Sequence, residues 1–241
     1  MNDNMKHNKL LAALIAALML LGMLSACAPA AATTATAAPE ATQAPGTLQE
    51  VAEIPASTGG VETTDMMGRE IKLAAPATRV VALSAADCEI LYAIGAGDLL
   101  VGRGEFCDYP AEVQAAPAVQ SGMETNIEQI IALAPQVLFM SAMAQTEDQV
   151  KQLEAAGIQC VVSDAKDING VYQAITLIGA VTGRDAEAMA VVDKMESTLS
   201  ELSVHASELE GKSVYFEVSP LQYGLWTAGK GTFMDEIATM L

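Results

Sequence analysis

The chain has 241 residues, of which 51% are hydrophobic but only 4% aromatic, and its formal net charge is −18. This apolar share excludes a chain that is disordered throughout, because disordered chains have too few apolar side chains to form a core. The 12 Lys and Arg residues against 30 Asp and Glu residues argue against a nucleic-acid partner, which needs clustered cations to neutralise phosphates. The length allows one or two domains.

Residues 1–26 have the composition of a signal peptide. An uncharged apolar run at 10–24 follows two lysines, and it is shorter than the roughly 20 residues that a membrane-spanning helix needs. The tetrad Leu24-Ser25-Ala26-Cys27 resembles a bacterial lipobox. We therefore expect cleavage before Cys27, lipidation of that cysteine, and anchoring at the extracytoplasmic face of the bacterial cell membrane. The alternative is an ordinary secretion signal followed by a chance cysteine.

The next part of the chain divides into a tether and an α/β lobe. Residues 27–60 are rich in Ala, Thr and Pro and lack apolar periodicity, which predicts a flexible tether of about 30 Å. Residues 61–73 predict a hairpin that turns at Met67-Gly68. Strands are then expected at 79–84, 99–102, 136–141 and 158–163, and helices at 86–94, 126–134, 146–156 and 167–181. This alternation predicts a parallel sheet in an α/β lobe at 61–183.

A long helix and a short remainder follow the lobe. Apolar residues recur every three or four positions along 184–210, which predicts one helix of about 39 Å that joins two lobes. They are Met189, Val192, Met195, Leu199, Leu202, Ala206 and Leu209. Residues 213–218 predict a strand, and a helix starts near Thr232. One strand and part of one helix cannot form a sheet lobe, so we expect 211–241 to be the incomplete start of a second α/β lobe in a fragment of a longer chain.

The cysteines and histidines predict no metal site. Beyond Cys27 the cysteines are Cys88, Cys107 and Cys160, none in a zinc-like spacing, and the sequence has two histidines. Cys160 lies in an apolar strand and is expected in the core. Cys88 and Cys107 both follow strand ends, so a disulfide between them stays open, since sequence alone does not determine pairing.

Motifs for catalysis and nucleotide binding are absent or poorly placed. The sequence has no GxSxG, HExxH or Ser/His/Asp arrangement, and we expect neither an enzyme nor a cofactor. A GxxxxGK pattern spans 224–230, but five residues separate it from the predicted strand and the bulky Trp226 lies within it. A phosphate-binding loop follows its strand directly, so nucleotide binding is disfavoured.

Five stretches of sequence carry a family resemblance. They are DMMGREIKLAAPATRVVALSAADCEILYAIGAGDLLVG at 65–102, GRGEFCDYPAEV at 102–113, NIEQIIALAPQVLFMS at 126–141, QTEDQVKQLEAAGIQCVVSD at 145–164 and GTFMDEI at 231–237. In this order they resemble the siderophore and vitamin B12 substrate-binding proteins of ABC importers. The resemblance implies two Rossmann-like lobes joined by a long rigid helix, with the second lobe truncated here. It also implies an ABC permease and its ATPase as partners, and a ferric siderophore, a corrinoid or haem as ligand.

Candidate ligand-binding residues follow from the carboxyl ends of the predicted strands, outside which ligands of parallel sheets bind. Aromatic rings offer flat surfaces to a macrocycle or chelate, and an arginine pairs with carboxylate or phosphate. The candidates are Ser84, Arg103, Phe106, Tyr109, Tyr223 and Trp226. Loop packing is the alternative for Phe106 and Tyr109. A single arginine on an acidic chain favours a neutral or cationic chelate, or a corrinoid, over an anionic catecholate.

Two acids are candidates for docking to the permease. In the family, one acid on each lobe fits a basic pocket of the permease, and the resemblance assigns Glu128 to the first position and Glu236 to the second. The alternative for each is an ordinary solvated carboxylate. Two other functions stay open for a protein with this sequence: a two-lobed lipoprotein that acts as a ligand sensor or scaffold, and an extracytoplasmic enzyme that uses the same cleft.

Overall fold

The computed structural model describes residues 59–122, 124–142, 145–209 and 211–240, so the predicted signal, most of the tether and Cys27 lie outside the described residues. The described chain opens with an antiparallel hairpin of β1 (Val61–Thr64) and β2 (Glu70–Leu73). Its turn lies at Met67-Gly68 as predicted, and Gly68 has a φ of 81°, a conformation that favours glycine. No helix within the described ranges is long and apolar enough to cross a bilayer.

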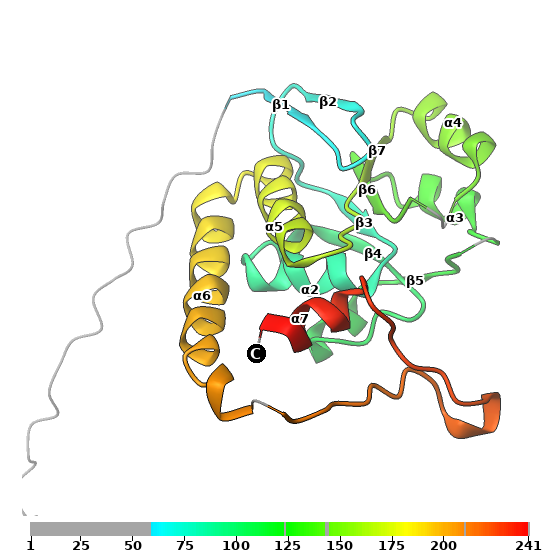
Figure 1. Cartoon of the computed structure of the whole chain (residues 1–241). Coiled ribbons are helices and arrows are strands. Elements are labelled where there is room, and N and C mark those ends of the chain that lie inside the picture. The colour runs from blue at the N-terminus through cyan, green and yellow to red at the C-terminus, as the bar shows by residue number, and fades with distance from the viewer. Residues whose placement is uncertain (1–58, 123, 143–144, 210, 241) are drawn as a thin grey trace, which may run out of the picture. The chain divides into compact units, whose positions relative to one another are not determined.

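A five-stranded parallel sheet forms the centre of the lobe (Figure 1). The strands lie in the order β5-β4-β3-β6-β7, with every neighbouring pair parallel. Their bounds are β3 (Val80–Ala82), β4 (Leu100–Gly104), β5 (Ala118–Val119), β6 (Val137–Met140) and β7 (Gln159–Val162). The predicted parallel sheet is confirmed. The sequence analysis missed β5, because a two-residue strand is too short to show a period-2 pattern.

The strand order reverses between β3 and β6. The chain builds β3, β4 and β5 in one direction, then returns to the other side of β3 for β6 and β7. In open parallel sheets, ligands bind outside the carboxyl ends of the strands at such a topological switch point. The sheet order therefore singles out the loops that follow β3 and β6.

Helices cover both faces of the sheet (Figure 1). Successive strand residues alternate between two apolar clusters: Val80 and Phe139 face one side, and Val81 and Leu138 face the other. A parallel sheet with both faces covered needs apolar residues at every strand position. The covering helices are α2 (Ala85–Ala93) and α5 (Ile168–Thr182) on the first side, and α3 (Ile127–Ala132) and α4 (Glu147–Ala155) on the second.

Side chains cap the starts of α3 and α5, and a glycine ends α5. The Asn126 side chain accepts a hydrogen bond from Gln129 N at 3.0 Å, and Asp167 accepts one from Gly170 N at 2.6 Å. Gly183 ends α5 in the left-handed conformation, with a φ of 68°. These bonds satisfy amides that a helix start leaves without partners. Short 3₁₀ turns complete the described chain: η1 (Gly97–Leu99), η2 (Ala111–Ala115), η3 (Ala206–Leu209) and η4 (Leu221–Tyr223).

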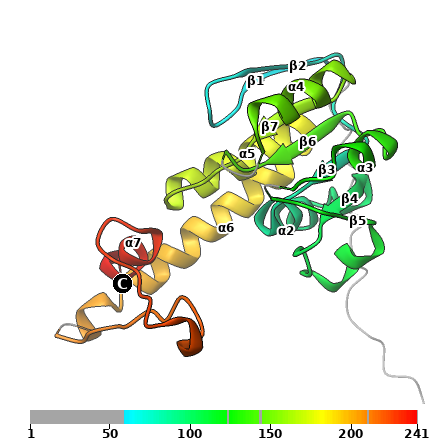
Figure 2. The same ribbon diagram turned by 90° about the vertical axis from the view of Figure 1, so that its right-hand side faces the viewer.

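The helix predicted over 184–210 is shorter in the structure. Helix α6 (Asp185–Ser203) packs against α5, and η3 follows it (Figure 2). Val192 and Met195 contact the core, whereas Met189 and Leu202 are exposed. Most helical stability in proteins comes from packing of an apolar face. The helix thus ends soon after the part of its apolar stripe that has a partner.

The strand predicted at 213–218 does not form. Val214 and Tyr215 are exposed, and the segment's one backbone hydrogen bond to the rest of the described chain joins Val218 N to Trp226 O at 3.2 Å. The prediction was wrong because a strand needs a neighbour to pair its amides and carbonyls, and the described residues supply none here. The helix expected near Thr232 does form, as α7 (Phe233–Met240).

A buried aspartate fastens the hairpin to the sheet. The Asp65 side chain is fully buried and accepts hydrogen bonds from Met67 N at 3.0 Å, Arg69 N at 2.9 Å and Val162 N at 3.1 Å. Its carboxylate also pairs with the Arg69 guanidinium at 2.8 Å, and that guanidinium donates to Cys160 O at 3.1 Å. One side chain therefore joins the hairpin turn to β7 through both charge and backbone contacts.

Candidate functional site

The loops that leave the carboxyl ends of the strands form the candidate site. The name carboxyl edge is used below for the residues that follow β3, β4, β6 and β7. These are residues 83–84, 105–110, 141–142 and 163–166. All five strands are parallel, so these loops gather at one edge of the sheet. Ser84 after β3 and Ser141 after β6 flank the switch point, which is the position that the fold favours for a ligand.

A buried carboxylate ties two loops of the carboxyl edge together. Asp87, in the first turn of α2, is only 1% exposed. The Ser84 hydroxyl accepts a hydrogen bond from Asp87 N at 3.1 Å and donates one to Asp87 Oδ2 at 2.6 Å. Ser163, which follows β7, donates from its hydroxyl to Asp87 Oδ1. Ser84, a predicted ligand residue, is thus the N-cap of α2 and bonds to Asp87.

The environment of Asp87 disfavours the ionised form of its carboxyl group. Burial raises the pKa of the Asp87 carboxyl from 3.8 to about 6, although the hydrogen bonds from Ser163 and Ser84 favour the charged form, and the neighbouring Asp164 raises the pKa further. The sequence analysis missed this residue because acids are so abundant in the chain. Its one local signal is its place three residues after a serine N-cap.

Replacement of Asp87 by asparagine tests this environment. A raised pKa in the folded state stabilises the fold below pH 4, where Asp87 is protonated, and this contribution is lost as the pH rises through about 6. The free energy of unfolding of Asp87→Asn relative to the natural protein should therefore rise by up to about 3 kcal/mol from pH 4 to pH 7. Urea unfolding at both pH values measures it. A difference that stays constant with pH would contradict the assignment.

Arg103 shapes the loop after β4. Its Nη1 donates to Gly104 O at 3.2 Å and to Cys107 O at 2.8 Å. A side chain at Gly104 would collide with Leu83 O, so the close approach of this loop to the end of β3 depends on glycine. The structure therefore gives Arg103 a supporting role in the loop, and part of its guanidinium is engaged before any ligand binds.

The loop held by Arg103 presents two aromatic side chains to solvent. Phe106 is 78% exposed and Tyr109 is 66% exposed, so most of each side chain is not packed within the loop. Aromatic rings that are exposed to water contribute little to the packing of their own loop. Their flat faces remain available to a flat ligand. These two residues are the predicted candidates that the carboxyl edge displays most openly.

The other two predicted aromatic residues lie on the segment before α7. Tyr223 and Trp226 are both exposed, and Trp226 Nε1 donates to Tyr223 O at 2.9 Å. Within the described chain, no hydrogen bond joins this pair to Phe106 or Tyr109. All four predicted aromatic side chains are therefore exposed.

The two candidate docking acids have different surroundings. Glu128 lies exposed in the first turn of α3, and its carboxylate makes no hydrogen bond or ion pair to another described residue. Glu236 of α7 accepts a hydrogen bond from Ile168 N, at the start of α5, at 2.9 Å. Glu128 is free to meet a partner, whereas Glu236 already caps a helix.

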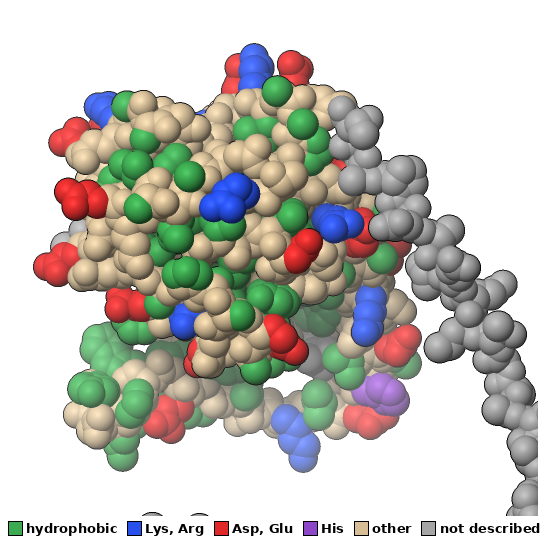
Figure 3. All heavy atoms as spheres, turned by 180° about the vertical axis from the view of Figure 1, so that it is seen from behind, with side chains coloured by type: hydrophobic (Ala, Val, Ile, Leu, Met, Phe, Trp, Pro, Cys, Tyr) green, Lys and Arg blue, Asp and Glu red, His purple; other side chains and the backbone are tan. Residues whose placement is uncertain are grey.

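Hydrogen bonds within the chain engage the backbone at the end of the GxxxxGK stretch. Gly231 N donates to Asp235 Oδ2 at 2.8 Å, and the Thr232 hydroxyl donates to Gly229 O at 2.7 Å. The Asp235 carboxylate therefore already accepts the hydrogen bond of an amide that a phosphate would need as a donor. Its negative charge would also repel the phosphate. Lys, Arg, Asp and Glu side chains are scattered over the face drawn in Figure 3.

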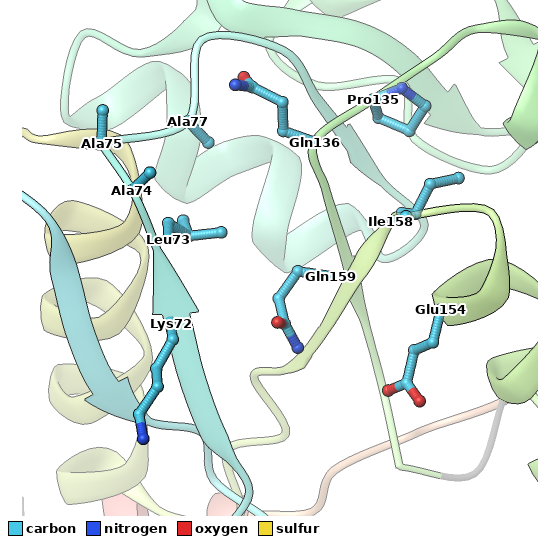
Figure 4. Close-up of a pocket in the computed structure, with 11 residues that line it drawn as sticks. Lys72, Leu73, Ala74, Ala75, Ala77, Pro135, Gln136, Glu154, Ile158 and Gln159 are labelled. Carbon is cyan, nitrogen blue, oxygen red and sulfur yellow. The ribbon is translucent and has the colours of Figure 1, made fainter.

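A hollow of about 720 Å³ lies at the opposite, amino edge of the sheet (Figure 4). Lys72 and Leu73 of β2 line it with Gln136 and Gln159. The Gln136 side-chain oxygen accepts hydrogen bonds from Thr78 N at 2.7 Å and Arg79 N at 3.1 Å. That oxygen supports the start of β3, and the hollow lies away from the switch point. We therefore place the candidate site at the carboxyl edge.

Comparison with known sequences identifies similar proteins whose names describe substrate binding or vitamin B12 binding. Over 187 residues the chain is 34% identical to an uncharacterized ABC transporter substrate-binding lipoprotein, YvrC, of Bacillus subtilis (strain 168), covering 75% of this chain and 59% of that protein. It is 30% identical to a vitamin B12-binding protein of Salmonella paratyphi A, covering 68% of this chain and 60% of that protein. The chain thus spans about three fifths of the length of these relatives.

Solved structures share the fold. The periplasmic vitamin B12 binding protein BtuF of Vibrio cholerae matches with a TM-score of 0.59 and 21% identity, over 68% of this chain and 64% of that one. The periplasmic heme-binding protein RhuT of Roseiflexus sp. RS-1 matches with a TM-score of 0.60 and 20% identity, over 67% of this chain and 63% of that one. Residues 80–240 also match the family model described as periplasmic binding protein. The chain therefore belongs to the periplasmic binding protein family.

Proposed function

We propose that this protein is the substrate-binding component of an ABC importer, which captures a metal-containing macrocycle or chelate and delivers it to a permease. The observation that carries the proposal is the pair of exposed rings, Phe106 and Tyr109, beside the switch point of a periplasmic binding protein lobe. The relatives' names, a substrate-binding lipoprotein and vitamin B12-binding proteins, support it. We place the protein at the extracytoplasmic face of the membrane, held by lipid at Cys27.

A corrinoid is the ligand that we favour over a ferric siderophore or haem. The exposed rings lie in a loop that also carries Glu105 and Asp108, and Arg103 Nη1 is engaged by backbone carbonyls. An anionic catecholate would meet acids with few free cations to offset its charge. A neutral or cationic corrinoid meets no such repulsion, and its flat ring matches the two aromatic faces.

The second half of the cleft is assigned to the residues after α6. We propose that α6 links two lobes, and that residues 211–240 belong to a second α/β lobe, where Tyr223 and Trp226 close over the ligand from the opposite side. Their exposure supports this assignment, since large aromatic surfaces are costly to leave in water without a partner.

A fluorescence titration of the full-length protein tests the proposed function. Trp226 is the single tryptophan of the sequence, so quenching reports on its own surroundings. We expect saturable quenching by cyanocobalamin at one ligand per protein, weaker effects of haem and ferric hydroxamates, and the least effect of ferric catecholates. Phe106→Ala should weaken binding about tenfold, the loss of about 1.4 kcal/mol of stacking.

Met67→Ala is the matched control, because Met67 is also an exposed apolar residue but lies in the hairpin turn. Equal affinities of Phe106→Ala and the natural protein would contradict the assignment of the carboxyl edge. A ligand that is recovered chemically altered would instead support an extracytoplasmic enzyme, and binding without uptake in cells would support a sensor.

A further inference from the structure

Two buried thiols lie beside the end of β3. Cys88 lies in the first turn of α2 and Cys107 in the loop after β4, and both are buried. Cys88 Sγ points to Ala82 O at 3.7 Å and Cys107 Sγ to Leu83 O at 4.0 Å, so the sulfurs lie over consecutive carbonyls at the end of β3. Each thiol is also the largest influence on the pKa of the other, which requires the two side chains to lie close together.

The backbone holds both cysteines in place without a covalent bond. Cys88 N donates to Ser84 O at 3.3 Å, and Cys107 N donates to Gly104 O at 3.0 Å. The carbonyl of Cys107 accepts from Arg103 Nη1 at 2.8 Å. The fold therefore holds both sulfurs beside consecutive carbonyls at the end of β3 through contacts of its own.

The two thiols also differ in acidity. The hydrogen bond with Cys107, together with burial, raises the pKa of Cys88, whereas the hydrogen bond from Cys88 lowers the pKa of Cys107. The pKa values of the two thiols therefore depend on each other in the folded protein, and it is the thiolate form of a cysteine that acts as the nucleophile in disulfide exchange. Burial raises the pKa of Cys160 to about 12, and Cys160 belongs to the apolar cluster on the other face of the sheet.

We propose that Cys88 and Cys107 form an intramolecular disulfide in the exported protein, which fastens the loop of Phe106 and Tyr109 to helix α2. The inference rests on the export that is part of the proposed function, because disulfides persist outside the cytoplasm. The bond would hold the aromatic loop in its ligand-binding position and reduce the conformational freedom that a ligand must otherwise restrict.

Formation of the disulfide is a two-electron oxidation, and a disulfide oxidant such as oxidised glutathione accepts the two electrons. The thiolate of one of the two cysteines attacks one sulfur of the oxidant, breaks its S–S bond and releases one thiolate, which takes up a proton. The other cysteine then loses its proton and attacks the protein sulfur of the mixed disulfide, which releases the second thiol. Two protein thiols are oxidised and one oxidant disulfide is reduced to two thiols. Because both sulfurs are buried in the finished fold, the bond forms while the loop is still open during folding.

Peptide mapping of the full-length protein tests the bond. The protein is refolded with oxidised glutathione, alkylated and digested with trypsin, which cleaves after Arg79, Arg103, Lys151 and Lys166 and so places the three cysteines on separate peptides. We expect peptides 80–103 and 104–151 to be linked, two hydrogen atoms lighter than their sum, with 152–166 alkylated. Alkylation of all three peptides, or a link that includes Cys160, would overturn the inference.

A thermal measurement adds a second readout. The oxidised protein should unfold about 5–10 °C above its reduced form. Cys88→Ser and Cys107→Ser should lose this difference, and Cys160→Ser, the matched control, should keep it. If a serine variant fails to fold, the oxidised and reduced natural protein still provide the comparison, and an equal midpoint would contradict the proposal. The mapping uses no ligand, so a failure of the proposed function would leave its outcome unaffected.

Discussion

Glu128→Lys is expected to abolish uptake of the ligand in cells while the protein keeps its affinity for that ligand. Glu128 lies in the first turn of α3, and α3 begins on the carboxyl side of the sheet because it follows β5. A permease that receives a ligand from the carboxyl edge must approach this same side. Its basic pocket would meet a lysine instead of a carboxylate, and like charges across an interface cost several kcal/mol, enough to lower transport more than 100-fold.

Glu70→Lys is the matched control for this charge reversal. Glu70 is an exposed acid in the hairpin, on β2, and its replacement should leave both uptake and affinity unchanged. Uptake is measured with radiolabelled ligand in cells that depend on the variant, and affinity with the purified protein. Normal uptake by Glu128→Lys, or a loss of its ligand affinity, would contradict the docking role.

Asp65→Ala is expected to lower the free energy of unfolding by about 3–5 kcal/mol. The substitution leaves the Arg69 guanidinium without its buried partner and leaves the amides of Met67 and Val162 without an acceptor. Unpaired buried donors are expensive because they have given up water without a replacement. Urea unfolding, followed by circular dichroism at constant pH, measures the loss.

Two further variants bracket the effect of Asp65. Asp65→Asn keeps an acceptor oxygen but removes the ion pair with Arg69, so its loss should be smaller than that of alanine. Glu62→Ala, on exposed surface of the same hairpin, should change the free energy of unfolding by less than about 0.5 kcal/mol. A loss below 1 kcal/mol for Asp65→Ala would show that the hairpin is held by its apolar contacts instead.

Local patterns in the sequence were sufficient to predict most of the α/β lobe. The alternation of strands and helices depends on neighbours within one turn or one strand, and the structure has this alternation. The strand order is different, because it depends on which strands meet in space. No local pattern distinguishes β6 beside β3 from β6 beside β5. The absent strand at 213–218 has the same cause, since its β-propensity is local but its pairing partner is not.

The candidate site was harder to predict than the fold. Sequence position alone placed Phe106 and Tyr109 in a loop at the carboxyl edge, and the structure shows them exposed there. The partners of Arg103 and Asp87 could not be predicted in this way. Asp87 bonds to Ser163 across the sheet, and such a contact between distant residues follows from the packed fold, which the type of residue does not reveal.

Native mass spectrometry of the full-length protein, mixed with equal amounts of cyanocobalamin, haem, a ferric hydroxamate and a ferric catecholate, tests the proposed binding most directly. We expect one complex to dominate, with a single corrinoid per protein, and the same complex to weaken in Phe106→Ala but not in Met67→Ala. A protein that retains none of the four ligands, or that binds them equally in both variants, would contradict a ligand site at the carboxyl edge.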